Sequence, residues 1–262
     1  MELIVWNSQG GKWDTLWSNY ILPRIIGSTD DDVSAYVVES GWAPWVSSGD
    51  VSINTRYSFD SRATYFDKSS LATSNFCHGV NVKRGRRAIW VPWVKNLDAM
   101  KTNTRCSMGI FSRSGPGLVH VFGVKKGRVF QRRPLARNVI SKGKITLLTV
   151  ILVHLISGSP SKAQEDMLDI IKAMSKVIPE GSAALIIGDM NIDLLVTPVE
   201  VPKYWRILNT GVATQQSGGE LDYGILYDPQ SQFTKATASV VEKFKTGNNG
   251  SDHSVMLYTL PL

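Results

Sequence analysis

The sequence predicts an α/β sandwich, in which long apolar strands are mixed with amphipathic helices. The longest apolar run, residues 145–153, is far shorter than the roughly 20 residues of a membrane span and is typical of a buried strand. A second apolar strand, 183–187, follows it, and a helical pattern of apolar residues lies between the two. A strand–helix–strand unit of this kind indicates an α/β fold.

The composition agrees with a folded globular chain. Of the 262 residues, 43% are hydrophobic, which excludes a wholly disordered chain, and the 22 glycines and 11 prolines show no triplet period, which excludes collagen. A chain of this length needs no disulfide or metal to hold its core. Cys77 and Cys106 are too few for a disulfide framework, and the sequence leaves open whether they are buried thiols or form one bridge.

Short apolar strands and two helices account for the expected elements. The helix before residue 183 begins with a capping-box pattern at Ser161 and Gln164, and a weaker helical pattern covers 13–26. The expected strands are 2–6, 35–38, 145–153, 183–187, 221–226 and 254–258.

Each expected strand has a polar residue at one end. Such ends converge on one edge of an α/β sheet, where ligands bind. Asp189 and Asn191 are two positions apart, so on an extended backbone both side chains point the same way. The residues at the strand ends are Asn7, Glu39, His154, Asp189, Asn191, Asp222, Asp252 and His253.

These residue types suit phosphoester chemistry. Carboxylates such as Glu39, Asp189 and Asp222 are the ligands that Mg²⁺ prefers. The imidazoles of His154 and His253 can serve as acid, base or hydrogen-bond donor. Each motif alone is ordinary, since a terminal Asn is usually a turn residue and an Asp-His pair usually lies at the surface. Their coincidence along the chain is what favours a site.

The charge is unevenly distributed. Residues 83–144 hold 16 basic residues and one acidic residue, so this segment carries +15 while the rest of the chain carries −8. A block of this kind usually faces a polyanion. Trp90 and Trp93 follow its densest patch, either as stacking residues of a nucleic-acid binder or as core residues. The patch consists of Lys83, Arg84, Arg86 and Arg87, and it also fits a short nuclear-targeting signal.

The ordered motifs resemble the endonuclease/exonuclease/phosphatase superfamily, of which deoxyribonuclease I is the type member. They match along most of the chain, although 42–105 shows little resemblance. Within the superfamily they look most like the active subunits of the cytolethal distending toxins. The matching segments are Trp6-Asn7, Val37-Val38-Glu39, Ser112-Arg113, Arg133-Pro134, Val153-His154, Gly188-Asp189-Met190-Asn191, Leu221-Asp222-Tyr223 and Ser251-Asp252-His253.

The resemblance implies a four-layer α-β-β-α sandwich of the deoxyribonuclease I-like type, formed by one domain over residues 1–262. It implies a Mg²⁺-dependent site, and oxygen ligands also admit Mn²⁺ or Ca²⁺. The implied metal ligands are Glu39 and Asp252. The implied phosphate-binding residues are Asn7, Arg133 and Asn191. The implied catalytic residues are His154, Asp189, Asp222 and His253, and Lys83, Arg84, Arg86, Arg87 and Arg113 are candidates for binding nucleic acid.

Three functions remain in competition. The first is a DNA-nicking endonuclease that acts as a genotoxin, which implies secretion, delivery subunits as partners and action in a host nucleus. The second is a phosphoinositide phosphatase on the same fold, and the third is a catalytically silent binding module. The chain starts without a recognisable signal peptide. One departure concerns substrate binding, because Ile192 stands where the toxin subunits often carry an arginine.

Overall fold

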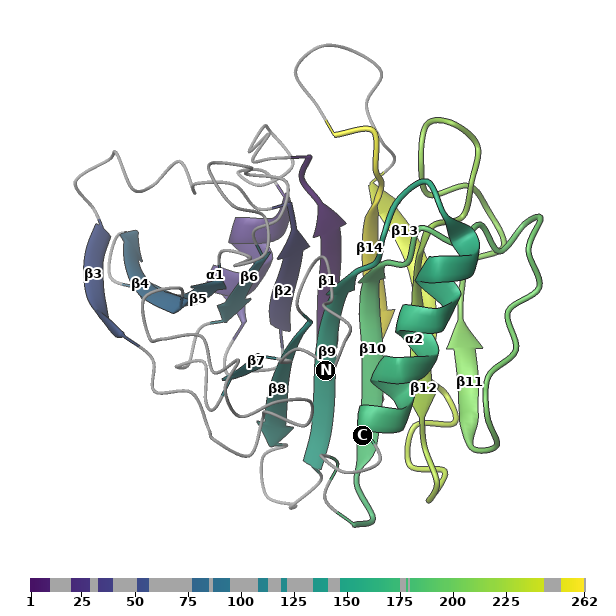
Figure 1. Cartoon of the computed structure of the whole chain (residues 1–262). Coiled ribbons are helices and arrows are strands. Elements are labelled where there is room, and N and C mark those ends of the chain that lie inside the picture. Colours follow the sequence, from purple (N-terminus) through teal and green to yellow (C-terminus); the bar gives the residue numbers. More distant parts are fainter. Residues whose placement is uncertain are drawn as a thin grey trace.

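The computed structural model describes residues 1–9, 20–28, 33–39, 51–56, 77–84, 87–94, 108–112, 119–121, 134–140, 147–174, 178, 180–242 and 251–261. Within these residues the chain forms an eight-stranded sheet and a six-stranded sheet (Figure 1). In spatial order the eight-stranded sheet contains β13 (Thr237–Glu242), β14 (Val255–Thr259), β1 (Glu2–Asn7), β2 (Val33–Val38), β6 (Met108–Ser112), β5 (Arg87–Val94), β4 (Cys77–Arg84) and β3 (Val51–Arg56). The six-stranded sheet contains β11 (Trp205–Leu208), β12 (Asp222–Tyr227), β10 (Ala183–Asp189), β9 (Leu147–His154), β8 (Leu135–Ile140) and β7 (Val119–Val121).

The two sheets pack face to face around a shared core. Successive side chains of a strand point to opposite faces, so alternate residues enter this core. Leu3 and Val5 of β1 pack there against Val150 and Leu185 of the other sheet. All seven residues of β10 are buried, since its outer face is covered as well, and this explains its unbroken apolar run.

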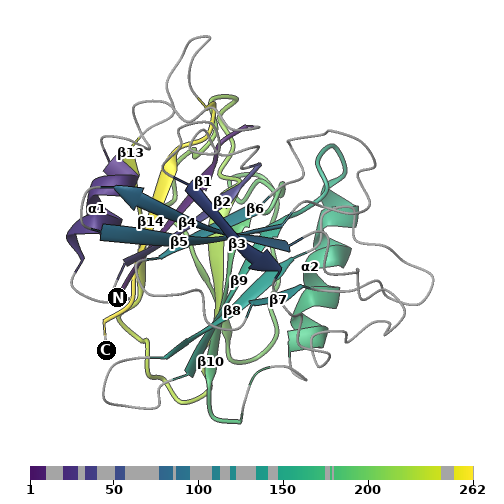
Figure 2. The same ribbon diagram turned by 90° about the vertical axis from the view of Figure 1, so that its left-hand side faces the viewer.

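Helices cover the two outer faces. Helix α2 (Pro160–Met174) packs Met167 and Ile170 against the outer face of the six-stranded sheet, beside Ile151 and Ile186. Helix α1 (Leu22–Gly27) contacts β2 and β5 of the eight-stranded sheet. Figure 2 shows α1 and α2 on opposite sides of the strands. The predicted four-layer α-β-β-α sandwich is therefore confirmed.

The six strands expected from the sequence are confirmed as β1, β2, β9, β10, β12 and β14. Of the expected helix over 13–26, the described part is α1, and residues 10–19 lie outside the described residues. The predicted capping box was wrong, because α2 begins at Pro160 and Ser161 and Gln164 therefore lie inside the helix. Proline suits the first helical position, since its fixed φ is helical and its missing N–H has no helical acceptor there.

No helix in the described part of the chain has the length and apolar character that crossing a membrane requires.

Candidate active site

Strand register brings three of the predicted residues side by side in the six-stranded sheet. Asp189, the last residue of β10, lies opposite His154 at the end of the parallel strand β9. On its other side Asp189 lies opposite Asp222, the first residue of the antiparallel strand β12. Residues that are far apart in sequence therefore meet at one end of this sheet.

The eight-stranded sheet supplies the other half of the site. Asn7 ends β1, Glu39 follows β2 directly, and His253 precedes β14. The hydroxyl of Ser251 donates to the backbone carbonyl of Asn7 and accepts from the backbone N–H of His253 at 3.1 Å. In Figure 1 the arrowheads of β1 and β2 point to the upper edge of the sandwich. The site thus lies between the ends of two sheets, whereas the sequence predicted one edge of a single sheet.

Gly188 allows β10 and β9 to approach closely at this end. Its φ is +135°, and a Cβ at this position would lie 2.0 Å from the carbonyl oxygen of Val153. No side chain can be accommodated at such a distance, so the Gly-Asp pair of the Gly188-Asp189-Met190-Asn191 motif has a direct structural cause.

The carboxylate of Asp189 is the centre of the site. Its Oδ2 accepts a hydrogen bond from Nδ2 of Asn7 at 2.9 Å. Nε2 of His154 lies 3.4 Å from the same oxygen, and Nε2 of His253 lies 3.8 Å from it. All four side chains are buried. Two imidazoles and an amide therefore converge on one carboxylate oxygen, and they come from both sheets.

The ring of His253 is held by Asp222. Nδ1 of His253 lies 2.8 Å from Oδ2 of Asp222, which leaves Nε2 facing Asp189. Burial by itself lowers the pKa of an imidazole, but the charges of Asp222 and Asp189 outweigh burial and raise the pKa of His253 to about 10. His253 is therefore a protonated imidazolium at neutral pH and a proton donor at Nε2.

Asp189 is suited to accept a proton, in contrast to His253. Burial raises the pKa of its carboxyl to about 6, against the opposing charge of His253. Its other oxygen, Oδ1, accepts the backbone N–H of Asn191 at 3.0 Å. Asp189 is therefore ionised at neutral pH, and its raised pKa makes it a stronger proton acceptor than an exposed carboxylate.

Asn191 lies beside Asp189 for a different reason than the sequence suggested. The prediction assumed an extended backbone, but β10 ends at Asp189 and Asn191 has a φ of +51°, so the chain turns there. The turn is closed by the backbone bond to Asp189, and Nδ2 of Asn191 donates to the carbonyl of Leu155 at 2.9 Å. A short polar side chain tolerates this left-handed backbone.

Glu39 and Asp252, the two predicted metal ligands, lie at the outer ends of the same group. Oε1 of Glu39 is 3.7 Å from Nε2 of His154, and Oδ1 of Asp252 is 3.6 Å from Nε2 of His253. Oδ1 of Asp252 is buried without a hydrogen-bond donor among the described residues. A carboxylate oxygen in this state suits a divalent cation, so Asp252 fits the implied metal.

A second grouping also has metal-binding spacing. Ligand atoms of Asp189, Asp222 and His253 all lie within 4.8 Å of one another in the described structure, and the three residues are buried. The sequence indicated Asp189 and Asp222 among the carboxylates that suit Mg²⁺, but it did not group them with His253. Oδ2 of Asp222 is bonded to His253, but its Oδ1 is buried without a hydrogen-bond donor among the described residues, so this trio is a second candidate position for an ion beside Glu39 and Asp252.

Several predicted residues cannot be placed in this site. Arg133, Arg86 and Arg113 lie outside the described residues. Lys83 and Arg84 belong to the end of β4 and Arg87 to the start of β5, where Arg84 pairs with Arg87 in an antiparallel hairpin. Only the backbone of these three residues is described.

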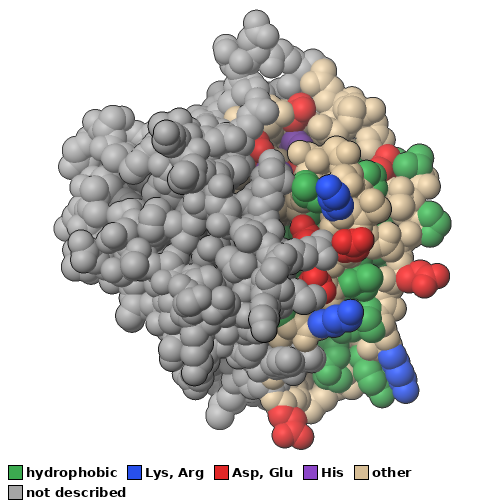
Figure 3. Space-filling model, in the orientation of Figure 1, with side chains coloured by type: hydrophobic (Ala, Val, Ile, Leu, Met, Phe, Trp, Pro, Cys, Tyr) green, Lys and Arg blue, Asp and Glu red, His purple; other side chains and the backbone are tan. Residues whose placement is uncertain are grey.

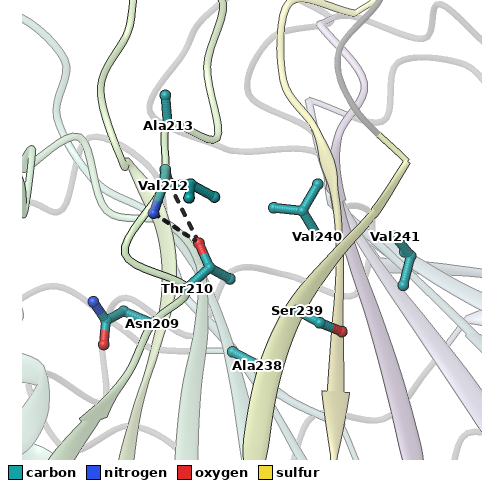
Figure 4. Close-up of a pocket in the computed structure, with 8 residues that line it drawn as sticks. All are labelled: Asn209, Thr210, Val212, Ala213, Ala238, Ser239, Val240 and Val241. Carbon is teal, nitrogen blue, oxygen red and sulfur yellow. Dashed lines mark hydrogen bonds between the residues drawn. The ribbon is translucent and has the colours of Figure 1, made fainter.

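The site reaches one end of the molecular surface, and it is separate from a groove nearby. Figure 3 shows a histidine between acidic side chains near the top of the described surface. The groove has a volume of about 750 Å³ and contains none of the predicted site residues (Figure 4). It lies between the segment after β11 and strand β13, and it is lined by Asn209, Thr210, Val212, Ala213, Ala238, Ser239, Val240 and Val241.

Comparison with known proteins supports the fold. No model of a protein family and no curated protein matches the sequence. The structure of CdtB, described as the biologically active subunit of cytolethal distending toxin, is 16% identical with a TM-score of 0.70, over 99% of this chain and 97% of that one. The cytolethal distending toxin of Haemophilus ducreyi is 18% identical with a TM-score of 0.68, over 100% and 98%.

A third structure is an endonuclease/exonuclease/phosphatase family protein from Leptotrichia buccalis. It is 11% identical with a TM-score of 0.60, and the match covers 100% of both chains. At these identities the likeness concerns the fold, and the fold is the deoxyribonuclease I-like sandwich that the motifs predicted.

Proposed function

We propose that this chain is a divalent-cation-dependent phosphodiesterase that nicks DNA, built as one domain over residues 1–262. The observation that carries the proposal is the convergence of Asn7, His154 and His253 on one oxygen of Asp189. Two imidazoles and a carboxylate at this spacing can deliver and remove protons on either side of a phosphoester.

In this proposal each side chain has a separate task. Asp189 orients the water that attacks phosphorus and accepts its proton. His253, held by Asp222 and protonated, donates its Nε2 proton to the sugar oxygen as the phosphorus–oxygen bond breaks. His154 donates a hydrogen bond to the phosphate, which stabilises the negative charge that develops there.

The remaining polar groups bind the phosphate and the cation. Asn7 and Asn191 contribute amide groups, and we propose Arg133 as an added positive charge. A cation held by Glu39 and Asp252, Mg²⁺ in the first instance, supplies charge neutralisation at the phosphate when it is bound. Mn²⁺ and Ca²⁺ have the same ligand preference for oxygen and are tested beside it.

DNA is proposed as the substrate because of the charge distribution. The +15 segment 83–144 would neutralise backbone phosphates, and this is the main source of affinity in DNA binding. The likeness to the structure of a biologically active toxin subunit supports a related role here. We therefore propose a secreted genotoxin that enters a host nucleus with the help of delivery subunits.

A plasmid assay tests this function. Purified protein is incubated with supercoiled plasmid and Mg²⁺, and conversion to the nicked form is measured for the wild type, His154→Ala and His253→Ala. His120→Ala serves as the matched control, because His120 lies on β7, three strands away from β10. We expect nicking by the wild type and the control only, and none in EDTA.

Other outcomes identify the competing functions. Phosphate release from a trisphosphorylated inositol lipid without nicking would identify a phosphoinositide phosphatase. Absence of both activities at high protein concentration would identify a silent binding module.

A further inference from the structure

The segment after β11 makes short backbone contacts with the residues around His253. The N–H of Ser254 donates to the carbonyl of Thr214 at 2.7 Å, and the N–H of Gln216 donates to the carbonyl of Asp252 at 2.8 Å. Gln215 forms a bridge of β type with His253 between these two bonds. This segment therefore fixes the backbone position of His253 from one side.

The hydroxyl of Thr214 makes contacts of a different kind. Its Oγ1 accepts the backbone N–H groups of both Leu221 and Asp222, each at 3.0 Å. The Thr214 side chain is fully buried, and its own N–H donates to the carbonyl of Gly219 at 2.9 Å. Without this hydroxyl, the two N–H groups at the start of β12 would lose their acceptor.

One residue is thus bonded to both strands that carry the Asp222–His253 pair. Its carbonyl holds the start of β14 through Ser254, and its hydroxyl holds the start of β12 at Asp222 itself. Asp222 begins β12 of one sheet and His253 precedes β14 of the other, so their 2.8 Å contact depends on the relative position of two strand ends. Because Thr214 is hydrogen-bonded to both strand ends, it limits their relative position directly.

We propose that Thr214 is a positioning residue that sets the spacing between Asp222 and His253. The proposal deepens the proposed function and rests on it, because it concerns how the acid His253 is oriented. It also predicts that the hydroxyl, and not the size of the side chain, is the important feature. Residues of this kind act on turnover through the geometry of the reacting groups.

The structure offers a closely matched control on the same segment. Thr210 also uses its hydroxyl in a partly buried bond, donating to Oε1 of Glu220 at 2.7 Å. Glu220 also accepts the N–H groups of Thr210 and Gly211, so Thr210 stabilises the same segment between β11 and β12 without touching the Asp222–His253 pair. Removing the hydroxyl of Thr210 therefore shows how much activity is lost when this segment is only destabilised.

The kinetic test uses Thr214→Val, which keeps the shape and removes the hydroxyl, and Thr214→Ser, which keeps the hydroxyl. We expect Thr214→Val to lower kcat in plasmid nicking by about 10- to 100-fold at unchanged KM, and Thr214→Ser and Thr210→Val to stay within about twofold of the wild type. Added to Asp222→Asn, Thr214→Val should cause no further loss, because both changes remove the same contact. Equal losses in Thr210→Val and Thr214→Val, or additive losses with Asp222→Asn, would overturn the proposal.

An NMR measurement separates this inference from the proposed function. The imidazole N–H proton of His253 that is bonded to Asp222 should give an exchange-protected signal in the wild type and Thr214→Ser, and it should be lost in Thr214→Val. If the wild type does not nick DNA, the proposed function fails, and this signal still decides the role of Thr214. An unchanged signal in Thr214→Val would contradict the proposed positioning role of Thr214. Should Thr214→Val not fold, Thr214→Cys, with a weaker acceptor of similar size, takes its place.

Discussion

Nδ1 of His253, which precedes β14 of one sheet, lies 2.8 Å from Oδ2 of Asp222, which begins β12 of the other sheet. The contact fixes the imidazole so that its Nε2 faces Asp189. Because the pair joins ends of the two sheets, the geometry of the site depends on how these sheets pack and on the segment that contacts both ends.

Removing the charge of Asp222 tests this dependence. Asp222→Asn keeps the size of the side chain but takes away the carboxylate that orients His253 and raises its pKa. We expect kcat for plasmid nicking to fall by about 10²-fold with little change in KM. Asp228→Asn is the matched control, since Asp228 follows the opposite end of β12. Similar losses in both variants would show that the effect is not specific to the pair.

The sequence was sufficient to predict which side chains meet. Strands buried on both faces have apolar runs that stand out, and the polar residues that end them, such as His154 and Asp189, are visible without a structure. The described structure places all eight predicted strand-end residues in one neighbourhood. Their roles in catalysis stay predictions.

Other features could not be predicted, because they depend on contacts distant in sequence. Thr214 looks like an ordinary loop residue until β12 and β14 are placed beside it. The turn at Asn191 depends on a bond to Asp189 that pattern analysis cannot show. The hairpin of β4 and β5 is absent from the expected strands, because the alternation in Val80-Asn81-Val82-Lys83 is short and β5 has none.

Gly188 is expected to tolerate no side chain. In Gly188→Ala the new Cβ would lie 2.0 Å from the carbonyl oxygen of Val153, so β9 and β10 would have to separate beneath the site. We expect a loss of at least about 3 kcal/mol in the free energy of unfolding, measured by urea denaturation. Gly211→Ala isolates the backbone strain, since φ is +72° there and no atom lies within 4 Å, and it should cost about 1 kcal/mol. Equal losses in Gly188→Ala and Gly211→Ala would mean that the close approach of Gly188 to Val153 does not affect stability.

The stability of the metal-free protein should depend on pH through His253. The pKa of this group is about 10 in the folded chain and 6.5 ordinarily, so the folded state binds more protons between these values. Its contribution is complete below pH 6.5 and is lost as the pH rises through about 10. In EDTA, we expect the free energy of unfolding to fall by a few kcal/mol across this range. His253→Asn should flatten the dependence, and a slope that persists in this variant would assign it to other groups.

Divalent cations should stabilise the folded protein through Glu39 and Asp252. An ion that binds only the folded state at 100 times its Kd adds about 2.7 kcal/mol, which is measurable as a rise in Tm with Mg²⁺. Glu39→Gln and Asp252→Asn should lose most of this rise. Asp222→Asn should keep it if Glu39 and Asp252 hold the ion, because Asp222 then serves only to hold His253 through its Oδ2. If Asp222→Asn alone loses the rise, the ion is held by the trio Asp189, Asp222 and His253 instead.

Neutralising the basic patch at the β4–β5 hairpin should weaken DNA binding without affecting the reaction itself. Changing Lys83, Arg84, Arg86 and Arg87 to glutamine removes four positive charges, and if each contacts a phosphate, the slope of log affinity against log salt concentration should flatten by up to about 3.6. KM for plasmid should rise while kcat at saturation stays near that of the wild type, since none of these four residues has a proposed part in the reaction. The control removes the same charge from four exposed lysines, and it should leave the salt slope nearly unchanged because long-range effects of net charge are screened. An equal flattening in both proteins would show that total charge, and not this patch, determines DNA affinity. The control residues are Lys162, Lys172, Lys203 and Lys235.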